Sequence, residues 1–470
     1  MIKLVLSEVV DAVGGKVAEG LPALSVRGVS TDSRTVGAGE LFCALRGPKF
    51  DGHAFVAEAV RRGAVGALVA AERAAEVRRA LAEAGLTGVL IEVRDPLEAL
   101  GRLAAYHRQQ LSADVIAVVG SNGKTTTKAM IDHVLAGRLR GRCNAKSFNN
   151  AIGVPLTLLS AEAADDYLVV EIGTNAPGEV AALARPKMAV ITCIAEEHLE
   201  RLGDLRGVAT EECSVLEHVA EGGFAALNVD WPAVREFVPR RPITVATFGR
   251  SPEADLRVTA ARYEAPWLHF EINGRFAYRL RMPGAHNALN AAGAIAIARR
   301  WGFEHEEIAA RLESFVALPM RGELLRMGGV LVVNDAYNAN PESALAAIDA
   351  LETLPAAGRR IVVFGEMCEL GERAGELHRR VADRLRHSRV SHVLLVGRAG
   401  VLMEAAGGGG DLFGPQVETS ETVEGCLEKL LPVLRDGDVV LLKASRAVGL
   451  ERLVEPLRAA LASRRPAAVG

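Results

Sequence analysis

The sequence predicts an α/β protein built from three domains with mainly parallel sheets. Short runs of β-branched residues alternate with longer stretches rich in Ala, Leu and Arg, and this alternation is typical of βαβ units. At about 150 residues per domain, a chain of 470 residues corresponds to roughly three domains. Hydrophobic residues make up 49% of the chain and charged residues 24%, which is ordinary for a soluble globular protein.

The first domain is expected over residues 1–95, and a helical stretch at 96–111 then leads into the second domain. Short apolar runs have the length of β-strands in this first segment. They lie at 41–45, 64–69 and 89–93.

The second domain is expected over 96–318 and the third over 319–470, after a linker that begins at Pro319. Both contain apolar runs of strand length separated by helical stretches, which indicates two separate open α/β sheets. In the second domain the expected strands lie at 114–120, 167–173 and 188–194. In the third they lie at 330–333, 360–365, 392–397 and 438–443.

The composition argues against several classes of function. The chain has 55 basic and 58 acidic residues and a net charge of -3, so bulk charge does not favour nucleic-acid binding. No apolar run approaches the roughly 18 residues of a membrane helix, and we expect no membrane insertion. Glu8 interrupts the N-terminal apolar run too early for a secretory signal. The six cysteines form no C-x-x-C pair, so we expect a cytoplasmic protein with reduced thiols.

A glycine-rich segment between an expected strand and an expected helix predicts a phosphate-binding loop. Glycines let backbone N–H groups surround phosphate oxygens, and the following helix N-terminus favours negative charge. Lys124 can reach the β- and γ-phosphates, and the Thr125 hydroxyl can bind Mg²⁺. The spacing G-x-x-G-K-T is shorter than the usual G-x-x-x-x-G-K-T. The residues of the expected loop are Gly120, Ser121, Asn122, Gly123, Lys124, Thr125 and Thr126.

Two further strands of the second domain end in candidate metal ligands. Glu171 follows one apolar run, and His198 follows the next. Because ligands gather at the carboxyl ends of strands in open α/β sheets, both side chains should lie on the same edge as the phosphate loop. A histidine after a strand is more often structural, but beside a phosphate loop we favour a metal site.

Two polar clusters have a structural and a functional interpretation. Asn287 and Asn290 open an Ala-rich helix, where an Asn amide can cap the helix or face a purine edge. Asp335 follows a strand of the third domain, where it can belong to a turn or hold ribose hydroxyls. No N-K-x-D motif is present, which disfavours a GTPase.

Together these residues resemble the Mur ligases, the ATP-dependent amide-forming enzymes of peptidoglycan synthesis. The resemblance extends over nearly the whole chain and in order. It implies a UDP-sugar-binding N-terminal α/β domain, a central P-loop ATPase-like domain and a C-terminal Rossmann-like domain. The matching blocks are Thr31-Asp32-Ser33-Arg34, residues 41–47, Asp51-Gly52-His53, residues 120–127, residues 149–157, residues 335–343, residues 365–372 and Lys443-Ala444-Ser445-Arg446.

Within that family, several details are similar to the member that joins D-alanyl-D-alanine to UDP-N-acetylmuramoyl-tripeptide through an acyl phosphate. The block D-x-Y-N-A-N-P-x-S from Asp335 to Ser343 is typical of it. This block and the K-A-S-R tail argue against a sister ligase that adds the third peptide residue, and against folylpolyglutamate synthase. A catalytically silent nucleotide-binding relative is disfavoured by intact Lys124, Thr125, Glu171 and His198.

The resemblance implies ATP and one or two Mg²⁺ ions as cofactors, and we expect a monomer. Thr125 and Glu171 would hold Mg²⁺, and His198 a second Mg²⁺. The residues expected at the nucleotide are, besides the loop, Asn287, Asn290, Arg321 and Asp335. Those expected at the UDP-sugar are Ser33, Arg34, Arg46, Gly47, Lys49, Asp51, Gly52 and His53. Tyr337, Asn338 and Asn340 are expected to line the catalytic or dipeptide-binding cleft.

The chain departs from the family at one informative position. Most Mur ligases carry a carbamylated lysine fourteen residues beyond the metal-binding histidine, where this chain has Glu212. No lysine lies between Lys187 and Lys429, so we expect no carbamylated lysine. Our hypothesis is that Glu212 engages the second Mg²⁺ through water or a shifted backbone, completing the catalytic set with Lys124, Glu171 and His198. The alternative is a solvated helix glutamate.

Overall fold

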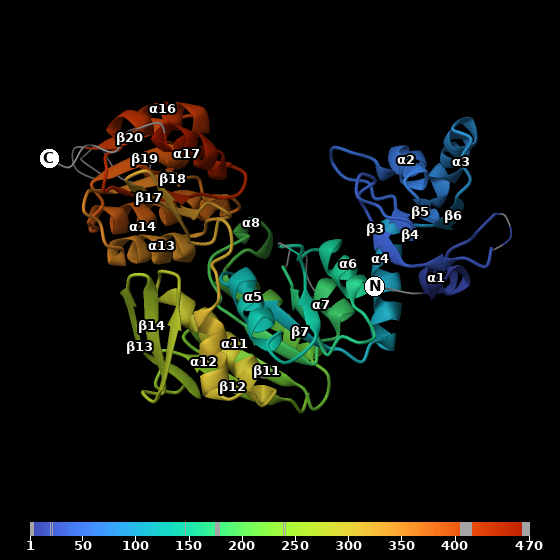
Figure 1. Ribbon diagram of the computed structural model, residues 1–470, viewed down its shortest axis with the longest axis horizontal. Helices are drawn as coiled ribbons and strands as arrows, with labels where there is room; N and C mark the ends of the chain where they lie inside the picture. The colour runs from blue at the N-terminus through green and yellow to red at the C-terminus, as the bar shows by residue number, and fades with distance from the viewer. Residues whose placement is uncertain are drawn as a thin grey trace.

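The computed structural model describes residues 4–18, 20, 22–145, 147–173, 179–237, 239, 241–404 and 416–462. Figure 1 shows three α/β lobes, with the central one joined to an N-terminal lobe on one side and a C-terminal lobe on the other. In the described residues their sheets have four, nine and six strands, beside a small two-stranded sheet. The predicted fold class of a three-domain α/β protein is confirmed.

The N-terminal sheet consists of parallel strands in the order β3-β4-β5-β6. Phe42 packs with helices α2 and α3, whereas its neighbours Leu41 and Cys43 pack with α1 and α4. Both faces are therefore covered, which explains the unbroken apolar runs of β4 and β5. The bounds are β1 (Leu4–Val5), α1 (Leu6–Val13), β2 (Ser25–Val26), β3 (Gly28–Ser30), β4 (Glu40–Cys43), α2 (Val56–Arg61), β5 (Gly66–Ala70), α3 (Ala74–Glu83) and β6 (Val89–Val93).

The central sheet has the order β15-β14-β13-β12-β11-β10-β7-β9-β8. Its strands run parallel from β8 to β13, as expected, and the expected strands at 114–120, 167–173 and 188–194 overlap β7, β9 and β10. Strands β13 to β15 pair antiparallel, an extension that we did not predict. The strand bounds are β7 (Asp114–Val119), β8 (Gly141–Cys143), β9 (Tyr167–Glu171), β10 (Met188–Ile191), β11 (Phe224–Asn228), β12 (Thr244–Gly249), β13 (Leu256–Glu264), β14 (Trp267–Ile272) and β15 (Phe276–Leu280).

Helices cover both faces of this sheet. Ile116 and Val118 of β7 pack toward α5 and α11, and Val115, Ala117 and Val119 pack toward α4 and α6. Helix α4 also packs on the N-terminal domain and so joins the two domains. The bounds are α4 (Pro96–Gln110), α5 (Lys124–Leu135), α6 (Gly153–Ser160), α7 (Glu179–Ala184), α8 (Leu199–Leu202), α9 (Leu205–Cys213), α10 (Pro232–Arg235), α11 (His286–Arg300) and α12 (His305–Glu313).

The C-terminal sheet has the order β16-β17-β21-β18-β19-β20. All neighbours are parallel except β16 and β17, which form an antiparallel hairpin at one edge. The bounds are β16 (Glu323–Met327), β17 (Val330–Asp335), α13 (Pro341–Thr353), β18 (Arg360–Gly365), α14 (Ala374–Arg386), β19 (His392–Val396), α15 (Ala399–Glu404), β20 (Val417–Ser420), α16 (Val423–Val433), β21 (Val439–Lys443) and α17 (Val454–Ala462).

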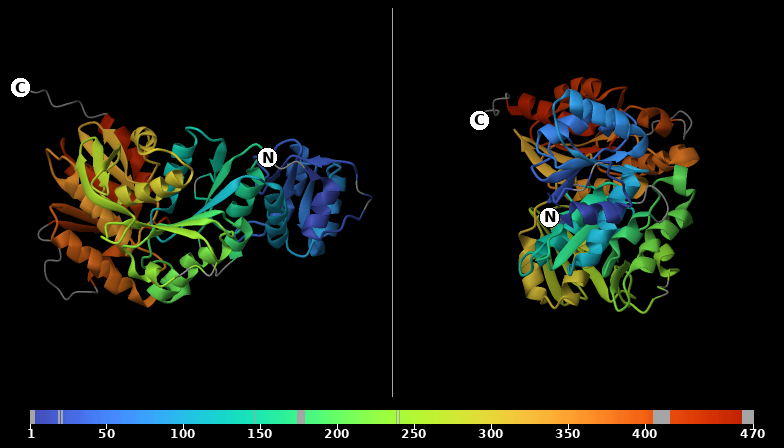
Figure 2. Two further views of the ribbon diagram at one scale, coloured as in Figure 1. Left: turned by 90° about the horizontal axis from the view of Figure 1, so that it is seen from below. Right: turned by 90° about the vertical axis from the view of Figure 1, so that its right-hand side faces the viewer.

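The molecule is elongated, with the N- and C-terminal domains at opposite ends in Figure 2. The C-terminal domain lies over the carboxyl edge of the central strands, near α8 and the start of α5 (Figure 1). Within the described part of the chain, no helix is both long and apolar enough to cross a membrane.

Candidate active site

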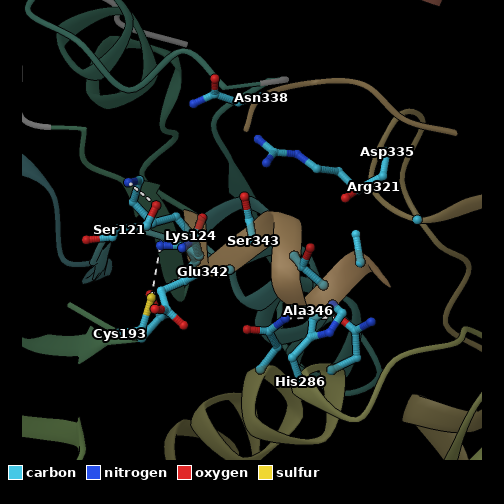
Figure 3. Close-up of a pocket in the computed structure, with 18 of the residues that line it drawn as sticks. Ser121, Lys124, Cys193, His286, Arg321, Asp335, Asn338, Glu342, Ser343 and Ala346 are labelled. Carbon is cyan, nitrogen blue, oxygen red and sulfur yellow. Dashed lines mark hydrogen bonds between the residues drawn. The ribbon is translucent and has the colours of Figure 1, made fainter. Parts of the chain in front are cut away.

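A cavity of ≈ 570 Å³ lies between the central and C-terminal domains, at the carboxyl ends of the central strands. The phosphate loop, the ends of β9 and β10, the start of α11, the linker after Leu318 and helix α13 all contribute to its wall. Figure 3 shows Ser121 and Lys124 on one side of this space and Arg321 and Asp335 on the other. Parallel strands place their ends on one edge, which brings these distant segments together.

The phosphate loop joins β7 to α5 in a tight turn. Gly120 and Gly123 have φ values of 118° and 82°, a region that favours glycine. A Cβ atom on Gly123 would lie 2.2 Å from Oδ1 of Asn290. Ser121 attaches the loop to the segment that follows β10, because its Oγ donates to Ala195 O at 3.0 Å and accepts from Ala195 N at 2.8 Å.

Lys124 is folded back onto its own loop. Its ammonium donates hydrogen bonds to two loop carbonyls, those of Gly120 and Ser121. The bond to Ser121 is 3.3 Å long, and the bond to Gly120 is shorter. Carboxylate oxygens of Glu197 and Glu212 lie 3.6 and 4.0 Å from Nζ. Burial disfavours the charged form, but these two carboxylates and that of Glu171 outweigh burial and raise the pKa of Lys124. Lys124 is therefore protonated and ready to bind phosphate.

Glu171 and Thr125 lie together, as the sequence predicted. Glu171 is 1% exposed at the end of β9, and its Oε1 accepts hydrogen bonds from Thr125 Oγ1 at 3.1 Å and Asn149 Nδ2 at 2.9 Å. Its second oxygen lies 3.3 Å from the ammonium of buried Lys128. We did not predict a site role for Lys128. The sequence signal that could have indicated one is its position one turn after Lys124 on helix α5, which begins at the loop.

His198 lies at the cavity but is joined to the C-terminal domain. Its Nδ1 forms a short contact with Glu369, and its backbone is left-handed, with φ 52°. Nearby Glu196 accepts hydrogen bonds from Arg373 at 2.8 Å and Arg380 at 3.1 Å, both in the C-terminal domain. These contacts hold the two domains together beside the phosphate loop.

Glu212 lies under the phosphate loop and not in solvent. It is 1% exposed, so the alternative of a solvated helix glutamate is wrong. Its Oε2 accepts a hydrogen bond of 2.6 Å from the backbone N–H of Gly120. Glu212 does not line the cavity, so contact with a metal there would need the water or the backbone shift that our hypothesis included.

The residues present fit a magnesium site. Glu171 Oε2 and Glu197 Oε1 are buried carboxylate oxygens that receive no hydrogen bond. Carboxylate oxygens are preferred Mg²⁺ ligands, and Mg²⁺ commonly uses one or two of them together with substrate phosphates. The described residues contain no cluster of three or more His, Cys, Asp or Glu side chains around one point.

The two asparagines at the start of α11 both line the cavity. Asn287 Nδ2 donates to Pro283 O at 2.7 Å, and Asn290 Nδ2 donates to Asn287 Oδ1 at 3.0 Å. The N-cap position is Ala285, so neither asparagine caps this helix. His286, which we did not predict, also lines the cavity, and burial lowers its pKa to about 4.

Arg321 reaches the phosphate loop from the linker. Its Nη2 donates to Thr125 Oγ1 at 3.0 Å, and its guanidinium lies 3.9 Å from the ring centre of Tyr337. Asp335 points into the same cavity and pairs with buried Lys443 at 2.7 Å. Lys443 opens the K-A-S-R block of the sequence, a signal from which we predicted no role for this lysine.

Asn340 contacts the phosphate loop directly. Its side-chain amide exchanges two hydrogen bonds of 3.0 Å with the amide of Asn122. Asn338 lines the cavity, and its carbonyl accepts a hydrogen bond of 2.9 Å from Lys443. The three residues predicted for the cleft therefore lie at the boundary between the two domains.

The expected UDP-sugar residues lie in the N-terminal domain and away from this cavity. His53 is held by the protein itself, because Nδ1 lies 2.6 Å from Asp51 and Nε2 accepts from Ala70 N at 2.9 Å. The backbones of Arg46 and Asp51 form an isolated antiparallel β-bridge that closes the loop between them. Exposed side chains in this set are those of Arg34, Arg46 and Lys49, and the others are Ser33, Gly47, Asp51, Gly52 and His53.

Comparisons with known proteins place the chain in a family. Residues 25–108 match the Mur ligase family catalytic domain, 118–298 the Mur ligase middle domain, and 320–446 the Mur ligase glutamate ligase domain. The chain therefore belongs to the Mur ligase family.

Several full-length relatives are D-alanyl-D-alanine-adding ligases. The UDP-N-acetylmuramoyl-tripeptide–D-alanyl-D-alanine ligase of Bacillus subtilis is 32% identical, over 97% of this chain and 99% of that protein. The same ligase of Escherichia coli is also 32% identical over 97% and 99%. The crystal structure of MurF from Acinetobacter baumannii is 26% identical, with a TM-score of 0.84 and coverage of 98% and 99%. MurF of Thermotoga maritima in complex with ADP is 27% identical, with a TM-score of 0.79 and coverage of 94% and 99%.

Proposed function

We propose that this chain joins D-alanyl-D-alanine to UDP-N-acetylmuramoyl-tripeptide, converts ATP to ADP and phosphate, and so acts in peptidoglycan precursor synthesis. The full-length similarity to ligases of this specificity supports the substrates. The observation that carries the proposal is the cavity itself. It brings the phosphate loop and Glu171 of one domain together with Asp335 and Asn338 of another.

The reaction needs an activated carboxylate. A carboxylate oxygen of the tripeptide attacks the γ-phosphorus, the bond to the β,γ-bridging oxygen breaks, and ADP leaves with the electron pair. The D-alanyl-D-alanine amine, with a pKa of about 8, loses its proton to solvent and attacks the acyl phosphate carbon. The tetrahedral intermediate then collapses to the amide, and inorganic phosphate leaves.

The protein supplies position and charge for this chemistry. The loop N–H groups and the N-terminus of α5 bind phosphate oxygens, and Lys124 turns from its loop carbonyls to the β- and γ-phosphates. Thr125 and Glu171 would hold Mg²⁺, which neutralises charge on the transferring phosphoryl group. His198 would hold a second Mg²⁺ after releasing Glu369, and Glu212 would contact that ion through water.

The remaining assignments concern the rest of the nucleotide. Asn290, Asn287 and His286 would face the adenine and Asp335 would hold the ribose, and all four residues line the cavity. Arg321 would move from Thr125 to the nucleotide. Ser33, Arg34 and the loop from Arg46 to His53 would bind the UDP-sugar. We also propose domain boundaries near residues 95 and 318, and a monomer.

Phosphate release from ATP and Mg²⁺ tests this function. UDP-N-acetylmuramoyl-tripeptide and D-alanyl-D-alanine are added singly and together, without bicarbonate. We expect release only when both are present. Lys124→Ala should lower kcat by about a hundredfold or more, whereas Lys429→Ala, at an exposed site away from the cavity, should not.

The choice of amine separates the related activities. L-Lysine, diaminopimelate or L-glutamate in place of D-alanyl-D-alanine should give no release. Phosphate release with one of these amines would identify the chain as a sister ligase. No phosphate release under any combination of substrates would indicate a catalytically silent relative.

A further inference from the structure

Glu197 is a buried acid in the nucleotide cavity that the proposed mechanism does not use. It lies between Glu196 and His198, both of which contact the C-terminal domain. Glu197 itself lies against the phosphate loop and lines the cavity. It is 6% exposed, and its Oε1 receives no hydrogen bond.

A buried carboxylate needs a positive partner, and the cation near Glu197 is Lys124. The separation of 3.6 Å between Nζ and Oε1 is an ion-pair distance. The same ammonium donates its hydrogen bonds to loop carbonyls. Glu197 and Lys124 therefore interact through their charges and not through a hydrogen bond. This interaction lasts only while the ammonium remains bonded to the loop carbonyls.

Nucleotide binding removes this partner. Lys124 has to turn toward the β- and γ-phosphates in order to bind them. Glu197 would then be a buried anion beside a triphosphate, an arrangement that is strongly unfavourable without a compensating cation. A divalent cation between the carboxylate and a phosphate oxygen supplies that charge, and oxygen ligands of both kinds suit Mg²⁺.

We propose that Glu197 is a ligand of a divalent cation that enters with the nucleotide and replaces the ammonium of Lys124 beside the carboxylate. This inference rests on the proposed binding of ATP. It assigns direct contact with the cation to Glu197. Glu212, whose Oε2 already accepts the Gly120 N–H at 2.6 Å, does not line the cavity and would contact a cation only through water. Cation binding and nucleotide binding would then strengthen each other.

Manganese binding tests the proposal independently of turnover. Mn²⁺ replaces Mg²⁺, the ATP analogue with a β,γ-methylene bridge replaces ATP, and free Mn²⁺ is measured by its paramagnetic resonance signal. In Glu197→Gln, which keeps the size and removes the charge, we expect the Mn²⁺ affinity of the analogue complex to fall about tenfold or more. Without nucleotide, wild type and variant should bind Mn²⁺ equally.

Two controls keep the result interpretable. Glu200→Gln makes the same chemical change at an exposed position three residues on and should leave Mn²⁺ binding unchanged. If Glu197→Gln does not fold, Glu197→Asp keeps the charge but shortens its reach, and it should also weaken Mn²⁺ binding. A folded variant with the Mn²⁺ affinity of wild type would overturn the proposal. Failure of the wild type to bind the nucleotide analogue would instead overturn the proposed function.

Discussion

Lys124 shows how the environment of one residue determines whether it can act. The ammonium is largely enclosed, yet carboxylates of Glu197 and Glu212 within 4.0 Å keep it charged. The same ammonium also donates hydrogen bonds to the loop carbonyls of Gly120 and Ser121. The nucleotide must therefore compete for Lys124, and the residues around the lysine set the strength of that competition.

Glu212 should matter for both stability and catalysis. Glu212→Ala leaves the buried N–H of Gly120 without an acceptor, so the free energy of unfolding should fall by about 1–3 kcal/mol. Glu212→Gln keeps an acceptor oxygen and should recover most of this stability, but it removes the charge near Lys124. We expect kcat, measured without bicarbonate, to fall strongly in both variants.

Urea unfolding and steady-state kinetics of the same preparations measure these effects. Glu221→Ala, an exposed glutamate in the same domain, is the matched control and should behave as wild type. Wild-type stability and kcat in Glu212→Ala would contradict the role of Glu212 at the loop.

Among the elements, helix α13 connects the C-terminal domain to the phosphate loop. Asn340 caps the helix by accepting from Ser343 N at 2.9 Å, and Pro341 occupies the first turn, where its missing N–H costs nothing. The Asn340 amide also pairs with Asn122. One side chain therefore both starts the helix and contacts the nucleotide loop.

Substitutions at Asn340 separate these two roles. Asn340→Ala removes the cap and the amide pair, so it should destabilise the C-terminal domain by about 1 kcal/mol and raise the KM for ATP. Asn340→Asp keeps the cap but cannot donate to Asn122 Oδ1, so stability should be kept while the KM for ATP rises. Thermal unfolding and the KM for ATP measure the two effects. An unchanged KM in Asn340→Asp would show that the amide pair does not influence the loop.

For the whole molecule, the relative position of two domains depends on partly exposed ion pairs. Glu196 contacts Arg373 and Arg380 across the boundary, and each arginine side chain is more than one-third exposed. Such pairs contribute about 0–1 kcal/mol and weaken with salt. Domain closure is therefore easily shifted, as a site that must admit a nucleotide and release products requires.

Loss of these pairs should open the nucleotide-free molecule. Arg373→Ala combined with Arg380→Ala should increase the radius of gyration measured by X-ray scattering and raise the KM for ATP, with little change in unfolding. Arg384→Ala is the matched control, because this arginine pairs with Asp349 and Glu352 inside the C-terminal domain. An unchanged radius in the double variant would contradict this role of the ion pairs.

Much of the fold could be predicted from the sequence, because parallel strands covered on both faces are continuous apolar runs. The expected strands of all three domains overlap observed ones, and the G-x-x-G-K-T segment joins β7 to α5. The antiparallel strands β13 to β15 were missed because one face is largely exposed and their apolar signal is interrupted. Thr125 and Glu171 could be placed together because the ends of parallel strands meet.

The sequence by itself determined the class of the protein, the position of its phosphate loop and the absence of a lysine where most of the family has one. Those features are local patterns or follow from the geometry of a parallel sheet. Only the tertiary structure decided that Glu212 lies beneath the loop while Glu197 lines the cavity, and that Asn340 pairs with Asn122. These contacts depend on the orientation of helices and on the relative position of two domains. The packing of the whole molecule sets the distances between residues that are remote in sequence, and no local sequence pattern encodes that packing.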